Sequence, residues 1–214
     1  MSGTKELGEA IERVIASPAE KLVAAYFDAS GPFAGATFDL LGAEESSRNA
    51  FTPSDLLAAS LLDVSMPPRF VRAVFGEDQS KAAELLQAIP DNVDLWNADE
   101  EVLACAEALW TWLREFADIG PVKAGKLLAR KRPRLIPVVD SVVMKLLPLP
   151  EGSAWKALRS ALEDGGLRAQ IEAIRPSRLD PRVTTLRLLD VAVWMRGSGS
   201  ENALEVRRSA GLDR

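Results

Sequence analysis

Apolar residues recur at spacings of three and four along most of the chain, which is the pattern of amphipathic helices. The longest such segment is Asp99–Phe116. Nine shorter segments show the same pattern or carry helix start signals. They are Pro18–Asp28, a helix opening at Thr52, Pro68–Phe75, Asp78–Ile89, Pro121–Lys131, Asp140–Leu147, Ser153–Leu162, Leu167–Ile174 and Pro181–Met195.

Strand signals are weak by comparison. The apolar runs Thr37–Leu41 and Leu135–Val139 are short and we interpret them as loop segments. Proline marks many of the helix starts, which favours short helices over a long bundle. We therefore expect an all-α fold, an irregular multi-helix domain over residues 1–197 in one body or two lobes. The Gly/Ser joint at 197–200 predicts a flexible tail at 198–214.

Two residue types are nearly absent, which limits the chemistry. The 214 residues include no histidine and one cysteine, Cys105. Serine–histidine and cysteine–histidine catalysis, imidazole metal sites, an internal disulfide and cysteine-ligated clusters are therefore excluded for one chain. We expect no metal and no cofactor. No run approaches the roughly 18 apolar residues of a membrane helix, and no secretory signal is visible, so we expect a cytoplasmic protein without a membrane partner.

Charge is distributed unevenly along the chain. Residues 1–101 carry 7 basic and 18 acidic side chains, whereas residues 102–214 carry 19 basic and 13 acidic ones. A basic half can form an anion-binding face even in a protein with a pI near 5.0. Alternatively, the two halves neutralise each other across a packed interface.

The basic residues are most concentrated in the segment 121–135, which has six basic residues and no acid. Side chains at spacings of three and four share one face of a helix. Gly120 and the proline after it form a tight turn, and the free N–H groups of the following helix can bind a phosphate. The predicted nucleic-acid-binding residues are Gly120, Lys123, Lys126, Arg130 and Lys131. Alternatively, the segment is a solvated face that pairs with the acidic half.

An aspartate interrupts the apolar run that follows. Asp140 lies between Val139 and Val142, twenty residues after Gly120. A carboxylate in such a run either caps a helix or uses its charge in function. We take Asp140 as the candidate catalytic residue, with the cap as the alternative.

These two features together resemble the helix-hairpin-helix superfamily of DNA base-excision glycosylases, the endonuclease III-like group. The family has a hairpin of the form L-P-G-x-G, which corresponds to Phe116–Gly120, and a catalytic aspartate about twenty residues later, which corresponds to Asp140. The segment 52–62 looks like an early leucine-rich helix of that family. The resemblance covers residues 52–147 and implies a helix-hairpin-helix-like element. An uncharacterised bacterial family within or near this superfamily also fits.

The chain departs from the family pattern at several positions. Asp118 occupies the first hairpin glycine, and Val122 occupies the position of the Schiff-base lysine in bifunctional members. Ser65 stands where the family has a glutamine at the end of the early helix. The resemblance therefore implies at most a monofunctional enzyme without lyase activity.

The resemblance implies a function on double-stranded DNA. A flipped damaged nucleotide would enter a cleft between two helical lobes, and Asp140 would stabilise positive charge as the base–sugar bond breaks. The alternative is a non-catalytic helical module that binds DNA or a protein and keeps the glycosylase-like fold. A structural protein without a nucleic-acid role would instead pair its basic face internally with the first half of the chain.

Overall fold

The computed structural model describes residues 2–42 and 48–212, and in these ranges the chain is all-α, with 12 α-helices and no strand. None of these helices has the length and apolar character needed to cross a membrane. The α-helices are α1 (Ser2–Ile15), α2 (Ala19–Tyr26), α3 (Pro53–Ser60), α4 (Pro68–Val74), α5 (Gln79–Gln87), α6 (Glu100–Arg114), α7 (Pro121–Lys131), α8 (Ser141–Leu146), α9 (Ala154–Leu162), α10 (Gly165–Ala173), α11 (Thr185–Gly197) and α12 (Glu201–Ser209). Short 3₁₀ turns occur at Ala34–Thr37 and Leu95–Asn97.

The chain divides into two compact units. The first unit combines residues 1–36 with 137–214, and the second unit is the continuous segment 37–136. The helical domain over residues 1–197 was expected in one body or two lobes, and the structure has these residues in two compact units. The segment 52–147, which resembles the glycosylase core, lies in the second unit up to residue 136 and continues into the first.

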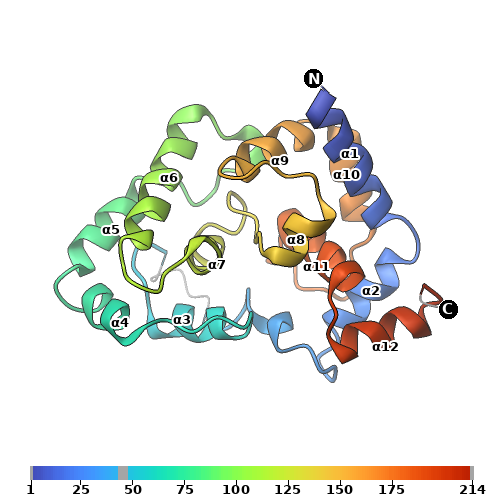
Figure 1. Cartoon of the computed structure of the whole chain (residues 1–214), viewed down its shortest axis with the longest axis horizontal. Coiled ribbons are helices and arrows are strands. Elements are labelled where there is room, and N and C mark those ends of the chain that lie inside the picture. Colours follow the sequence, from blue (N-terminus) through green and yellow to red (C-terminus); the bar gives the residue numbers. More distant parts are fainter. Residues whose placement is uncertain (1, 43–47, 213–214) are drawn as a thin grey trace. The chain divides into compact units, whose positions relative to one another are not determined.

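Helix α7 is central to the second unit. It packs against α3 and α6. Helix α5 packs against both α6 and α4 (Figure 1). Every residue from Ala124 to Lys131 is buried, although three of these eight residues are cationic. A helix that is buried all round is normally apolar, so the cations of α7 need partners inside the unit.

Helix α11 has the same central place in the first unit. It packs against α1, α2, α8, α10 and α12 (Figure 1). Its residues from Leu186 to Val193 are all buried, including the ion pair of Arg187 and Asp190. Tyr26, Phe33 and Trp194 form a ring cluster beside it, with ring centroids 5.2 to 6.0 Å apart.

All ten predicted helices are present, and the bounds of α7 match the prediction. Two further helices were missed. The N-terminal helix α1 buries an apolar stripe at helical spacing on an otherwise charged segment: Leu7, Ala10, Ile11, Val14 and Ile15. The segment 198–214, which was predicted to be a flexible tail, contains α12, a helix that buries Ala203 and Arg207 against its neighbours.

Arg132, directly after α7, is the largest fully buried side chain in the described part of the chain, with 1% exposure. Its guanidinium pairs with no carboxylate among the described residues. Instead it donates to five oxygens. They are the carbonyl oxygens of Leu86, Ile89 (2.8 Å), Arg48 (2.8 Å) and Lys131 (2.9 Å), and the side-chain oxygen of Asn49 (2.8 Å). Leu86 and Ile89 lie at the C-terminal end of α5, where helix carbonyls lack intrahelical donors and carry partial negative charge.

Replacing Arg132 with lysine should lower the free energy of unfolding by about 3 kcal/mol, because a single ammonium cannot reach all these carbonyl groups and buried carbonyls are left unpaired. Urea unfolding measures the loss. Arg134→Lys is the matched control. Arg134 makes an exposed bidentate pair with Asp94 at 2.8 Å, so its replacement should cost less than about 1 kcal/mol. Equal losses in both variants would contradict the capping role of Arg132.

Candidate functional site

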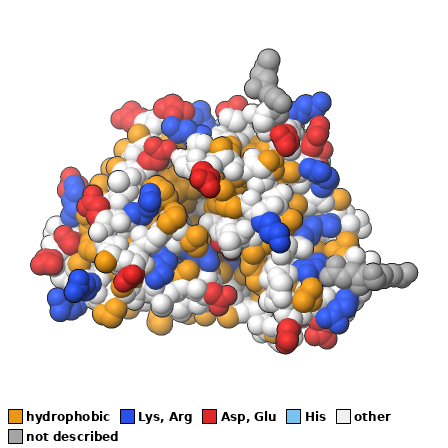
Figure 2. Space-filling view, viewed as in Figure 1, with side chains coloured by type: hydrophobic (Ala, Val, Ile, Leu, Met, Phe, Trp, Pro, Cys, Tyr) orange, Lys and Arg blue, Asp and Glu red, His pale blue; other side chains and the backbone are white. Residues whose placement is uncertain are grey.

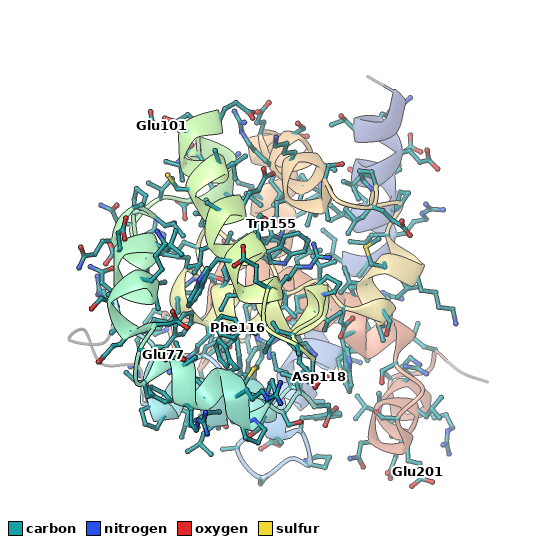
Figure 3. All side chains as sticks on the ribbon, turned by 60° about the vertical axis from the view of Figure 1, so that its left-hand side comes forward. Glu77, Glu101, Phe116, Asp118, Trp155 and Glu201 are labelled. Carbon is teal, nitrogen blue, oxygen red and sulfur yellow. The ribbon has the colours of Figure 1, made fainter. Side chains whose placement is uncertain are left out.

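The turn between α6 and α7 has a backbone shape that glycine normally supplies. Asp118 has a positive φ of 66°, in the left-handed region that non-glycine residues rarely adopt. It is exposed, whereas Ile119 beside it is 3% exposed and anchors the turn in the core. Figure 3 labels Asp118 and Phe116 where the chain passes from α6 to α7. Asp118 thus has a backbone conformation that glycine adopts more easily, and its side chain places a negative charge at this turn.

The N-terminus of α7 follows this turn and is open. Gly120 is the exposed N-cap residue and provides no side-chain cap, and a Cβ placed on it would meet nothing within 4 Å. Among the described residues, the N–H groups of Val122 and Lys123 have no acceptor. Free N–H groups at the positive end of a helix dipole are a general anion-binding arrangement.

A tryptophan on α6 holds this N-terminus in place. The Trp110 indole donates to the carbonyl oxygen of Pro121 at 3.3 Å. The exposed guanidinium of Arg114 lies 4.2 Å above the Trp110 ring. Two cations therefore belong to this region. The half-buried Lys123 lies in the first turn of α7, and Arg114 lies in the last turn of α6.

Lys126 and Arg130, two of the predicted nucleic-acid-binding residues, are buried, with exposures of 7% and 8%. The Lys126 ammonium donates to the carbonyl oxygen of Leu62 at 2.7 Å, in the turn after α3. Arg130 donates to the carbonyl oxygens of Phe38 (2.7 Å) and Leu41. Both cations thus donate hydrogen bonds to backbone carbonyl oxygens in the first half of the chain.

Lys131 is also buried, and it shares one carboxylate with Arg130. The Asp55 carboxylate, 2% exposed, accepts from Lys131 at 2.9 Å and from Arg130 at 3.2 Å. It also accepts from the Thr52 backbone N–H and hydroxyl, and completes the capping box of α3. Burial lowers the pKa of Lys131, and the neighbouring Asp55 carboxylate opposes this shift.

These contacts correct the expectation of an exposed basic face on α7. Lys126, Arg130 and Lys131 donate to oxygens of residues 38–62, so the second half of the chain pairs internally with the first half at this helix. Of the predicted nucleic-acid-binding residues, Gly120 is exposed and Lys123 is half-buried. DNA binding itself stays a prediction.

Asp140 belongs to the first unit and is the N-cap of α8. Its Oδ1 accepts from the N–H groups of Val142 (2.9 Å) and Val143 (3.0 Å). The side chain is half-buried, and its Oδ2 accepts no hydrogen bond from the described residues. The cap role predicted as an alternative is present, and one carboxylate oxygen is left over. Asp140 lies in the first unit, whereas the α6–α7 turn lies in the second unit.

Residues 19–197 match a family of unknown function, DUF6308. The chain belongs to this family. The match begins at the first residue of α2 and ends at the last residue of α11, so α1 and α12 lie outside it. No curated protein and no solved structure matches the chain. The DUF6308 assignment therefore leaves the glycosylase resemblance as a prediction.

Sequence reasoning missed two residues that matter most in this region, Asp55 and Arg132. Asp55 was visible as the acid of a capping box, but nothing in the sequence pairs it with residues 75 positions later. Within the described ranges, no three aspartate, glutamate or cysteine side chains are close enough to hold a metal.

Asp55→Ala should lower the free energy of unfolding by about 3–5 kcal/mol at pH 7, because Arg130 and Lys131 lose their buried counter-charge. Asp78→Ala is the control, since the Asp78 side chain makes no cap hydrogen bond to α5. It should change stability by less than about 0.5 kcal/mol. Denaturant unfolding at pH 7 compares the two variants.

The deficit of Asp55→Ala should also shrink as pH rises. Removing the carboxylate lowers the pKa of Lys131 further below its ordinary 10.5. Between the pKa of Lys131 in the folded variant and its pKa in the unfolded chain, the unfolded chain binds more protons than the folded chain. The variant therefore gains stability as the pH rises, until the pH passes the pKa of Lys131 in the unfolded chain. Unfolding curves at pH 7 and pH 10 measure this gain. A deficit that is equal at both pH values would contradict the pairing of Asp55 with Lys131.

Proposed function

We propose that this chain is a DNA-binding protein that contacts a backbone phosphate at the turn between α6 and α7. The observation that carries the proposal is the left-handed conformation of Asp118 directly before a helix N-terminus with free N–H groups. This is the local geometry expected of the hairpin in DNA glycosylases that the sequence resembles. Phosphate contacts of this type position a protein on DNA without reading its sequence.

The surface charge supports a contact through the turn instead of through a broad basic patch. On the face shown in Figure 2, Lys and Arg side chains are interspersed with Asp and Glu. The buried cations of α7 are not available to a ligand. Binding would therefore use the helix dipole, its free N–H groups, Lys123 and Arg114, and would involve few phosphates.

The catalytic part of the proposal concerns Asp140. When a base–sugar bond breaks, positive charge develops on the sugar. A carboxylate fixed by its own hydrogen bonds stabilises that charge with little reorganisation. Oδ1 of Asp140 is fixed by two backbone N–H groups, and Oδ2 is left to face a sugar or a water. In this role the chain is a monofunctional glycosylase-like hydrolase of damaged DNA.

A specific observation favours the second candidate, a non-catalytic helical module that binds DNA or a protein. The two cap bonds of Asp140 already give that residue a structural reason to be present. In addition, three of the five predicted DNA-contacting residues are used by the fold. The two candidates differ in base release, and not in the turn that contacts DNA.

Asp118→Gly should strengthen DNA binding by about fivefold, because it removes a negative charge beside the proposed phosphate position. Asp63→Gly is a matched control. Asp63 is also an exposed aspartate in the same unit with a positive φ, 58°. Its replacement by glycine therefore removes one negative charge and relieves the same kind of backbone strain as Asp118→Gly. Fluorescence anisotropy with a duplex that carries a stable abasic-site analogue measures both variants at low salt. Equal affinities of the two variants, or no binding by the wild-type chain, would contradict the proposal.

Asp140→Asn should keep DNA binding and abolish base release. Asparagine keeps an oxygen acceptor for the cap bonds but loses the charge. Asp164→Asn is the control, since Asp164 caps α10 in the same unit through its bond to Gly166 at 2.8 Å. The assay is base release from duplexes with different damaged bases. Base release that persists in Asp140→Asn would contradict the catalytic role of Asp140. DNA binding without base release by the wild-type chain favours the second candidate.

A further inference from the structure

The end of α11 approaches α8 more closely than any side chain allows. Gly197 is the last residue of α11. A Cβ placed on it would lie 2.5 Å from the Leu146 Cδ1 and 2.8 Å from the Val142 Cγ1. Carbon atoms in contact are about 3.5–4.0 Å apart, so a substitution here must displace part of α8.

The two contacted side chains differ in how they can respond. Leu146 is 36% exposed, and its Cδ1 can rotate toward solvent. Val142 is β-branched, so its side chain has fewer accessible rotamers than that of Leu146. The contact with Val142 is therefore relieved by movement of the α8 backbone at its first turn.

The first turn of α8 is also the part that Asp140 caps. The N–H of Val142 donates to the Asp140 Oδ1 at 2.9 Å, and Val143 donates to the same oxygen at 3.0 Å. A displacement of Val142 changes both cap bonds together. Gly197 is thus connected to the Asp140 carboxylate through one residue.

The α11 side of this contact is held firmly. Arg207 on α12 donates to the carbonyl oxygens of Met195 (2.8 Å) and Ser198 (2.9 Å), on either side of Gly197. The Ser198 N–H donates to the carbonyl oxygen of Trp194 at 2.8 Å. Because this end of α11 is anchored by a buried guanidinium, α8 is the element that yields.

We propose that Gly197 is a positioning residue for the Asp140 carboxylate, acting through the close contact of α11 with Val142. The link from Gly197 to Asp140 is independent of any ligand. Its functional meaning rests on the proposed role of Asp140. In a glycosylase-like enzyme, Gly197 sets the place of the essential carboxylate from a different helix.

The test uses the chain in five forms: wild type, Gly197→Ala, Gly197→Ala with Val142→Ala, Gly199→Ala, and Asp140→Ala. The Cβ of Gly199→Ala meets nothing within 4 Å, so this neighbouring variant is the matched control. The NMR signals and hydrogen-exchange rates of the Val142 and Val143 amides report the cap bonds, and Asp140→Ala gives the reference for a lost cap.

We expect Gly197→Ala to move both amide signals toward the Asp140→Ala positions and to accelerate their exchange about fivefold, the effect of a lost N-cap. The added Val142→Ala change should restore the bond to Asp140 and return the Val143 signal to its wild-type position. Gly199→Ala should change neither signal. If Gly197→Ala does not fold, the double variant carries the test, because it must fold with a wild-type Val143 signal.

Unchanged cap signals in Gly197→Ala, or no rescue by Val142→Ala, would overturn the positioning role. Anisotropy with the abasic-analogue duplex is measured on the same samples. Failure of the wild-type chain to bind that duplex would overturn the proposed DNA-binding function while leaving the cap measurement decisive for Gly197.

Discussion

Buried cations that donate to the carbonyl groups at helix ends are the interaction on which this fold depends. The twelve α-helices of the described residues end in many carbonyl groups without intrahelical donors, and burying such groups unpaired is costly. The chain supplies the donors from arginine and lysine. In the second unit the buried Lys126 donates to the turn after α3, and the buried Arg132 donates to the end of α5. In the first unit the buried Arg207 donates to the end of α11, and the half-buried Arg196 and Arg168 donate to the ends of α1 and α9.

This use of cations explains the basic run 121–135 better than a ligand does. Asp55 neutralises part of the charge, and backbone carbonyls stabilise the rest. A run without any acid in the sequence is therefore compatible with a buried helix, because its partners come from residues far away along the chain. The proposed phosphate contact lies at the turn before α7, where it would depend on backbone N–H groups more than on the number of basic side chains.

Much of the helical pattern could be predicted from the sequence, because apolar spacing, proline starts and capping residues are local signals. The Thr52 capping box and the bounds of α7 are examples. Burial of the α7 cations could not be predicted, since it depends on contacts across 64 to 92 residues. The α12 helix was missed because its Gly/Ser joint looks flexible, while its anchor, Arg207, looks like a solvated charge. The N-cap role of Asp140 was predicted from the sequence beside a catalytic role, and one aspartate can have both; the structure shows the cap.

Burial of the α7 cations is measured by the rate at which an amine-reactive reagent modifies each lysine of the folded chain, determined by peptide mass spectrometry. The chain offers exposed references in Lys145 and Lys156, and a half-buried one in Lys123. If the α7 cations belong to the fold, Lys126 and Lys131 react far more slowly than these references and become reactive only on unfolding. Reaction of Lys126 and Lys131 at the rate of Lys145 in the folded chain would contradict the claim and restore an exposed basic face.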